Sequence, residues 1–176
     1  MNILQTQIAG VAVVALNAHQ DERGTFTRLF CAQDFASLGL PDRLVQWNLS
    51  QNPLQGTLRG LHWQDTNAPE DKLIHCLSGA IWDVAVDVRA GSKTYGTHFS
   101  TRLQAGDGRA LQVPAGCAHG FLTLEPETTV LYGVSGAYSP KAERGARWDD
   151  PFFGIEWPDA PAIVSEKDRS WPDFQL

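Results

Sequence analysis

Residues 58–64 read LRGLHWQ and combine an arginine, a histidine and a tryptophan, and Lys72 follows shortly after them. The imidazole of His62 is a side chain that can accept or donate a proton. Arg59 can bind a phosphate or a carboxylate through two parallel hydrogen bonds. These residues indicate either the wall of a polar cavity or a strand with a hydrogen-bonded histidine and a surface arginine. Alternation along a strand predicts two faces, one with Arg59, Leu61 and Trp63 and the other with Leu58, Gly60, His62 and Gln64.

Other polar side chains occur at positions that suit the same cavity. Gln46, Asn48 and Ser50 alternate, which predicts three neutral hydrogen-bonding groups on one face of a strand. Such a stripe is ordinary on an outer sheet face and equally suits the floor of a polar pocket. Lys72 precedes the apolar run 73–77, where a lysine is solvated by default. If it were desolvated, its ammonium group would stabilise negative charge developing on an oxygen.

Residues 114–119 read PAGCAH, a PxGxxH pattern that resembles the second motif of the cupin β-barrels. In metal-binding cupins this histidine is a ligand, and the metal needs further ligands, usually two neighbouring histidines and a carboxylate. His62 is followed by Trp and Gln instead of a second histidine two residues later. The ligand set is incomplete, so we expect no metal and interpret His119 as a pocket histidine.

The composition is typical of a globular protein, and we predict a single domain over residues 1–176. The net charge of −6 argues against binding to nucleic acid polymers or anionic membranes, but it is compatible with a local basic pocket for a small phosphate ligand.

Cys31, Cys76 and Cys117 form no CxxC pair, which predicts buried free thiols in a reducing compartment. No run is long enough to span a membrane and no basic start precedes the apolar residues 8–16, so we expect a cytoplasmic protein.

Many short β-rich segments separated by turns predict an all-β sandwich or barrel with a few short helical turns. One helical turn is expected over residues 34–39, closed by Gly39. The expected strands cover residues 1–16, 25–30, 44–50, 58–64, 73–77, 79–89, 97–103, 110–113 and 130–138.

Several side chains carry specific packing expectations. Phe26 and Phe30 are expected in the core, and His75 is interpreted as a structural or surface histidine. Asp83 and Asp87 fall on the same face of the strand 79–89. If that face is buried, both carboxylates need partners such as Arg89 or Arg59, and their role would be structural or would be to hold the residues that contact the substrate.

The order of these motifs resembles the dTDP-4-dehydrorhamnose 3,5-epimerase family. The resemblance runs from about Asp21 to Asp168 and is carried by DERG at 21–24, QWNLS at 46–50, RGLHWQ at 59–64 and the Lys-Leu pair at 72–73. It implies a cupin-like jelly-roll fold and a homodimer whose N-terminal strands cross to the partner. It also implies cofactor-independent epimerisation at C3 and/or C5 of a nucleotide-linked 4-keto-6-deoxyhexose, through an enolate. The implied reaction converts dTDP-4-dehydro-6-deoxy-D-glucose to dTDP-4-dehydro-L-rhamnose, and the chain has no GxGxxG or P-loop motif that would indicate a nucleotide cofactor.

The resemblance also implies roles for individual residues. His62 would be the base, Asp168 would orient its ring, Tyr132 would be the acid on the opposite face, and Lys72 would stabilise the enolate oxygen. Tyr138 would stack on the nucleotide base. The residues implied in substrate binding are Arg23, Phe26, Arg28, Gln46, Asn48, Arg59, Lys72, His119, Tyr138, Glu143 and Lys167.

Arg28 is the clearest departure from the family pattern, because the family usually carries a glutamate that contacts the substrate at this position. The preferred nucleotide and sugar therefore stay open. One alternative is a 3- or 5-monoepimerase acting on another nucleotide-linked 4-keto-6-deoxysugar. Two others are a non-catalytic cupin that binds sugar nucleotides, which would need neither an acid nor a base, and a metal-dependent cupin oxygenase, which the missing ligands disfavour.

Overall fold

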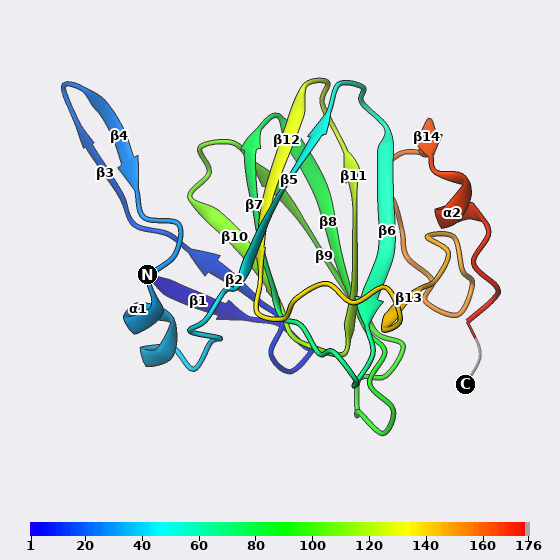
Figure 1. Cartoon of the computed structure of the whole chain (residues 1–176). Coiled ribbons are helices and arrows are strands. Elements are labelled where there is room, and N and C mark those ends of the chain that lie inside the picture. Colours follow the sequence, from blue (N-terminus) through cyan, green and yellow to red (C-terminus); the bar gives the residue numbers. More distant parts are fainter. Residues whose placement is uncertain (175–176) are drawn as a thin grey trace.

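The computed structural model describes residues 1–174, in which two large β-sheets pack face to face (Figure 1). Pairing is antiparallel, except that β14 (Ile163–Val164) runs parallel to β6 (Thr57–Gln64). The first sheet has the order β1 (Asn2–Gln5), β2 (Ala12–Ala15), β10 (Arg109–Val113), β7 (Lys72–Ser78), β12 (Thr128–Val134) and β5 (Gln46–Asn52). The second has the order β13 (Glu143–Gly145), β6 (Thr57–Gln64), β11 (Cys117–Thr123), β8 (Ala80–Asp87) and β9 (His98–Gln104). The predicted all-β, cupin-like jelly-roll fold is confirmed.

The main core lies between the two sheets and takes alternate residues from both. Ile74 and Leu111 come from the first sheet, Ile81 and Phe121 from the second, and all four are almost fully buried. Val84 points to the opposite face of β8 and packs in a second apolar cluster. Strand β8 therefore shows the predicted alternation and buries apolar surface on both faces, the main source of stabilisation in such a sandwich.

Helix α1 (Ala32–Ser37) covers the outer face of the first sheet. Phe35 is its buried residue and packs with Leu73 of β7, and its ring lies 4.8 Å from that of Phe30. The helix ends at Ser37, Leu38 is its C-cap, and Gly39 follows with a φ of +70°. A glycine in the left-handed region is the predicted way to close this turn.

The prediction of one strand over residues 1–16 is wrong, because the chain reverses between β1 and β2. Gly10 adopts a φ of +84°, which favours glycine, and the hydroxyl of Thr6 donates across the turn to the carbonyls of Ile8 and Val11. Strand β1 pairs with β2, and β2 pairs with β10 of the same chain. The N-terminal strands thus join their own sheet.

Phe26 is 68% exposed, so the prediction that it belongs to the core is wrong. It lies on the hairpin of β3 (Ala18–Asp21) and β4 (Gly24–Thr27), which projects away from both sheets (Figure 1). Within the described residues these two strands pair only with each other. Phe30 lies beyond the hairpin and packs in the cluster around Phe35, as predicted.

The buried acids of β8 have partners, as their burial requires. Asp87 accepts a hydrogen bond of 2.8 Å from the Nε of Arg89, which confirms one predicted pairing. Asp83 contacts His119, and the alternative pairing with Arg59 is wrong. The two carboxylates therefore have different partners, Arg89 and His119.

The three cysteines are unpaired, as predicted, but only Cys76 and Cys117 are buried, and Cys31 is half-buried. In the described part of the chain, α1 and α2 (Glu166–Arg169) are far too short to cross a bilayer.

His75 is a buried histidine of β7, 2% exposed, and neither ring nitrogen has a hydrogen-bond partner among the described residues. Its ring stacks against that of Trp47, with the centroids 6.5 Å apart. Burial lowers the pKa of His75 to about 4, because the charged form loses hydration that nothing replaces. The interpretation of His75 as a structural residue is therefore confirmed, and a surface position is excluded.

We expect His75→Phe to remove a pH dependence from the stability of the protein. The folded-state pKa of about 4 lies below the unfolded value, so the wild type is most stable above about pH 6.5 and loses stability as pH falls towards 4. Between pH 7 and pH 5 this group accounts for a loss of about 2 kcal/mol. Urea unfolding at both pH values and one protein concentration measures it. His19→Phe on the exposed hairpin is the matched control, and equal slopes for the wild type and His75→Phe would contradict the assignment.

Candidate active site

A cavity of about 830 Å³ is lined by residues of both sheets and of the C-terminal segment. A second hollow of about 380 Å³ adjoins it, since His62, Lys72 and Tyr132 line both. The predicted site residues in the larger cavity are Arg59, His62, Lys72, His119, Tyr132, Lys167 and Asp168. Those in the smaller one are Gln46, Asn48, His62, Lys72, Tyr132, Tyr138 and Glu143.

Arg59 and His62 of β6 line the same cavity, although strict alternation predicts that they point to opposite faces. Leu61 packs on the opposite side, in an apolar cluster under the second sheet. The pairing of β6 with β11 shifts register between His119 and Phe121, which breaks the alternation beside Gly60. The predicted grouping of Arg59 with Leu61 and Trp63 is therefore wrong.

Gly60 permits this irregularity because the two strands approach too closely for a side chain. Its φ is +117°, and a Cβ here would lie 2.6 Å from the Cα of Gly120 and 2.7 Å from the carbonyl oxygen of His119. This close contact between β6 and β11 places His62 opposite His119 in the paired strands.

His62 and Asp168 form a hydrogen-bonded pair at the cavity wall. The Nε2 of His62 donates to the Oδ1 of Asp168 at 2.6 Å, and the backbone N–H of Gly60 donates to Oδ2 at 3.2 Å. The backbone N–H of Asp168 in turn donates to the hydroxyl of Ser165, which caps α2. Burial acts to raise the pKa of Asp168, but the hydrogen bond with His62 leads the contacts that lower it below its usual value. The carboxylate therefore stays ionised beside the ring.

Lys72 is the first residue of β7 and its side chain is 9% exposed. Its ammonium group contacts the carboxylate of Glu70, which is equally buried. Burial lowers the pKa of Lys72 to about 8. Tyr132 on β12 lines the same hollow, and burial raises the pKa of its hydroxyl, against an opposing effect of the Arg59 charge. The phenol is therefore protonated at neutral pH.

His119 on β11 forms a second histidine–carboxylate pair. Its Nε2 donates to the Oδ1 of Asp83 at 2.7 Å, while the Oδ2 of Asp83 has no hydrogen-bond partner in the described part of the chain. Burial raises the pKa of Asp83, and the contact with His119 opposes that shift. The side chain of His119 is 10% exposed, compared with 34% for His62.

Tyr138, Glu143 and Lys167 form a polar chain at the rim. The Tyr138 hydroxyl donates to the Oε2 of Glu143 at 3.1 Å, and Lys167 Nζ lies 2.5 Å from Oε1. The hydrogen bond from Lys167 is the main reason that the pKa of Glu143 is lowered. Gln46 donates to the amide oxygen of Asn48 at 2.9 Å beside them.

Three predicted binding residues lie away from both hollows within one chain. Arg23 forms an ion pair with Asp21 at the tip of the β3–β4 hairpin, and Phe26 lies on the same hairpin. The Nη1 of Arg28 lies 3.6 Å from the Oδ2 of Asp34 of α1. The cavity of a single chain therefore does not receive these residues.

Two residues of the site escaped the sequence analysis. Glu70 belongs to the polar loop 65–71, and only its position two residues before Lys72 could have singled it out. For Asp83 the sequence predicts a structural or a supporting role, but it does not show that the partner is His119. Among residues 1–174, no group of three or more His, Cys, Asp or Glu side chains is arranged to hold a metal ion.

The family model for dTDP-4-dehydrorhamnose 3,5-epimerase matches residues 5–175 of this sequence. The chain belongs to the dTDP-4-dehydrorhamnose 3,5-epimerase family. One relative, the dTDP-4-dehydrorhamnose 3,5-epimerase of Sinorhizobium fredii, is 44% identical over 95% of this chain and 86% of its own length.

Solved structures of other members of this epimerase family have the same fold. A crystal structure of dTDP-4-dehydrorhamnose 3,5-epimerase from Bacillus anthracis with TDP and PPi bound matches with a TM-score of 0.95 and 37% identity, over 98% of this chain and 99% of that one. A crystal structure of dTDP-6-deoxy-D-glucose-3,5-epimerase from Legionella pneumophila in complex with dTDP-4-keto-L-rhamnose matches with a TM-score of 0.90 and 34% identity, over 99% of both chains.

We expect Gly60→Ala to destabilise this epimerase-family chain far more than Gly106→Ala. Both glycines have a positive φ, so both substitutions cost about 1 kcal/mol in backbone strain. A Cβ at Gly106 would meet open space, whereas one at Gly60 would overlap the backbone of β11 and force the strands apart. Thermal and urea unfolding should show an additional loss of about 2 kcal/mol or more for Gly60→Ala. Equal losses would show that the close approach of the strands is not needed.

Proposed function

We propose that the protein epimerises C3 and C5 of dTDP-4-dehydro-6-deoxy-D-glucose to give dTDP-4-dehydro-L-rhamnose, without a cofactor. The observation that carries the proposal is the His62–Asp168 pair, 2.6 Å apart, in one cavity with Lys72 and Tyr132. A nucleotide-sugar substrate agrees with the ligands of the relatives: the B. anthracis structure has TDP bound and the L. pneumophila structure has dTDP-4-keto-L-rhamnose.

The chemistry needs a base, an acid and a group that stabilises an enolate. The C4 ketone of the substrate acidifies the protons on C3 and C5, and epimerisation removes such a proton from one face and returns one to the other. In the proposal His62 takes the proton through its second ring nitrogen, while Asp168 holds the ring and stabilises the imidazolium that forms. Each such proton transfer contributes on the order of 10²–10⁴-fold in rate.

Tyr132 and Lys72 complete the proposed set. Because burial raises the pKa of Tyr132, the phenol keeps its proton at neutral pH and can deliver it to the opposite face of the enolate. The ammonium group of Lys72 would donate a charge-assisted hydrogen bond to the enolate oxygen, in a cavity where that charge is poorly screened.

The remaining polar groups supply contacts to the rest of a nucleotide-sugar. Arg59, His119 and Lys167 would bind the pyrophosphate and position the sugar. Gln46 and Asn48 offer neutral hydrogen bonds, and Tyr138, a residue 55% exposed at the rim, offers a face for the base. Glu143 would orient Tyr138 and Lys167 through the two contacts described above.

We also propose that the protein acts as a homodimer in which each β3–β4 hairpin reaches the cavity of the partner. In support, the hairpin projects from the body of its own chain and leaves Phe26 largely exposed (Figure 1). Arg23 and Phe26 would then complete the partner's site. Arg28, close to the same hairpin, would influence which nucleotide or sugar is preferred. The proposed setting is the cytoplasm, in line with three unpaired cysteines.

Proton NMR in deuterated water with dTDP-4-dehydro-6-deoxy-D-glucose tests the proposal directly. We expect the wild type to introduce deuterium at both C3 and C5 with no added metal or cofactor. His62→Ala and Asp168→Ala should lose exchange by about 10²-fold or more while still binding dTDP, as measured by calorimetry. His98→Ala, outside both hollows, is the matched control.

Exchange at one carbon only would replace the proposal with a monoepimerase. No exchange with bound substrate would favour a sugar-nucleotide-binding cupin, and full activity of His62→Ala would refute the assignment of the base.

Mixed dimers test whether the hairpin serves the partner's cavity. We expect Arg23→Glu and His62→Ala to be nearly inactive as homodimers, because one repels the pyrophosphate and the other lacks the base. A heterodimer of the two, isolated through different affinity tags, should regain about half of the wild-type activity, since a two-fold dimer then has one intact site. Activity no greater than that of the parents, or a monomer in light scattering, would show that the hairpin does not cross.

A further inference from the structure

We propose that Glu70 is a positioning residue that keeps the Lys72 ammonium charged and directed into the cavity, and that Gln64 holds Glu70 in place for this task. The inference rests on the proposed epimerase chemistry, in which Lys72 stabilises the enolate oxygen. It assigns roles in that chemistry to two further residues, Glu70 and Gln64, and gives the structural reason for each role.

The contact between Lys72 and Glu70 joins two charges that are almost removed from water. Their side chains are 9% and 10% exposed, and both line the hollow that also contains His62 and Tyr132. An isolated buried charge costs several kcal/mol, and this cost is offset only by a well-placed opposite charge with further hydrogen bonds. Glu70 provides the opposite charge for Lys72, so removing its carboxylate leaves an uncompensated ammonium.

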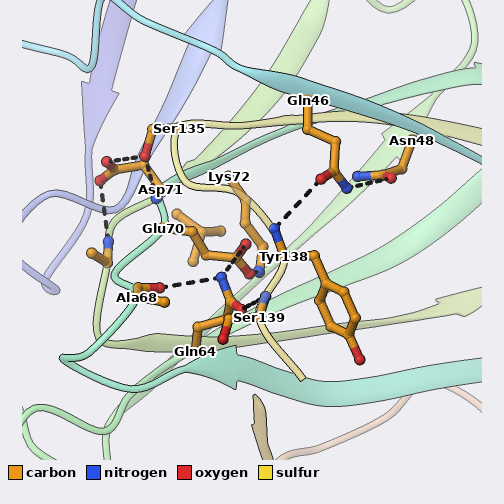
Figure 2. Close-up of polar contacts among 12 residues, drawn as sticks. Gln46, Asn48, Gln64, Ala68, Glu70, Asp71, Lys72, Ser135, Tyr138 and Ser139 are labelled. Atoms are coloured by element: carbon orange, nitrogen blue, oxygen red, sulfur yellow. Dashed lines mark hydrogen bonds and ion pairs between the residues drawn. The ribbon is translucent and has the colours of Figure 1, made fainter. Parts of the chain in front are cut away.

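Gln64 holds the second carboxylate oxygen of Glu70 (Figure 2). It is the last residue of β6, 4% exposed, and its Nε2 donates to the Oε2 of Glu70 at 3.1 Å. The same nitrogen lies 3.1 Å from the carbonyl oxygen of Ala68 and 3.2 Å from that of Ala137. Its Oε1 accepts a 2.6 Å hydrogen bond from the backbone N–H of Ser139. One amide thus fixes Glu70 and ties together the two loops, residues 65–71 and 135–139, that flank it.

Asp71 anchors the backbone next to Glu70 (Figure 2). Its carboxylate accepts from the N–H of Ala115 at 3.1 Å and from the hydroxyl of Ser135 at 2.8 Å. The backbone N–H of Ser135 returns a bond of 3.0 Å to the carbonyl of Asp71. Glu70 is therefore held on both sides, by the anchored backbone of Asp71 and by the side-chain amide of Gln64. A carboxylate on the protein surface is not held in this way.

The electrostatic need for Glu70 follows from the surroundings of Lys72. Burial alone lowers the pKa of Lys72 to about 8, and the carboxylate of Glu70 in contact with the ammonium acts against that shift, so its removal would reduce the charged fraction of Lys72. A neutral amine gives a far weaker hydrogen bond to an enolate. The other titratable or charged side chains that line the two hollows are Arg59, His62, His119, Tyr132, Tyr138, Glu143, Lys167 and Asp168. Among them, Arg59 and Lys167 carry the same charge as the Lys72 ammonium, so they do not stabilise it. The carboxylates of Glu143 and Asp168 are already bound to Lys167 and His62.

The decisive variant is Glu70→Gln, which removes the charge and keeps the shape. We expect kcat to fall about tenfold or more with a smaller change in KM, and the alkaline limb of the kcat profile to move to lower pH by about one unit or more. Glu125→Gln is the matched control, because Glu125 pairs with Arg102 on the surface. Glu70→Asp, which keeps the charge, should restore the position of the alkaline limb at least in part.

A second readout does not depend on activity. Acetic anhydride labelling across pH, followed by mass spectrometry, gives the pH at which each lysine becomes a nucleophile, with Lys93 as an internal reference. In Glu70→Gln we expect Lys72 to become reactive at lower pH than in the wild type, while Lys93 is unchanged. If the wild type proves inactive on the nucleotide-sugar, the proposed function fails, yet this experiment still decides whether Glu70 controls the Lys72 charge.

Thermal unfolding separates this role from simple loss of structure. If Glu70→Gln does not fold, Gln64→Leu replaces it as the test, since it keeps the carboxylate but releases its anchor and should shift Lys72 reactivity in the same direction by less. An alkaline limb and a Lys72 reactivity that are both unmoved in the folded variant would overturn the proposal. A fall in kcat with no change in Lys72 reactivity would also overturn it, because Glu70 would then act on something other than Lys72.

Discussion

The site depends on one constraint: ionisable groups can be placed inside a β-sandwich only if each is given a partner. The apolar core fills the space between the sheets, and the cavity lies where polar side chains interrupt it. Its chemistry-bearing groups are accordingly built as pairs, each from two different segments or from a strand and its preceding loop. These pairs are His62 with Asp168, His119 with Asp83, Lys72 with Glu70, and Lys167 with Glu143.

The two histidine pairs have the same chemistry but different access to the cavity. The close approach of Gly60 to Gly120 sets His62 opposite His119 in neighbouring strands. The side chain of His62 is 34% exposed and that of His119 is 10% exposed. A base must reach a carbon-bound proton, so the more accessible ring suits proton transfer. The less accessible ring, held by a fully buried carboxylate, suits a fixed hydrogen bond to the substrate.

The sequence could predict the residues of the site better than their arrangement. Periodicity identified most strands and the opposite faces of β8, and the order of the motifs identified the family. It could not predict that Arg59 and His62 share a cavity, because that depends on a register shift between two strands far apart in the chain. Phe26 was misplaced for a related reason: an apolar residue indicates burial, but the sequence does not say whether its own chain provides the cover.

The link through Gln64 explains why the loops around the cavity are as constrained as its strands. Loops ordinarily tolerate movement, and a shift of about 1 Å in a catalytic group can cost about 10²-fold in rate. Gln64 ends β6, the strand that carries His62, and its amide bonds both to the partner of Lys72 and to the N–H of Ser139, the residue after Tyr138. The proposed base, the lysine proposed to stabilise the enolate and the proposed platform for the nucleotide base are therefore all connected to one buried side chain. A displacement of any one of these segments would therefore move the other two.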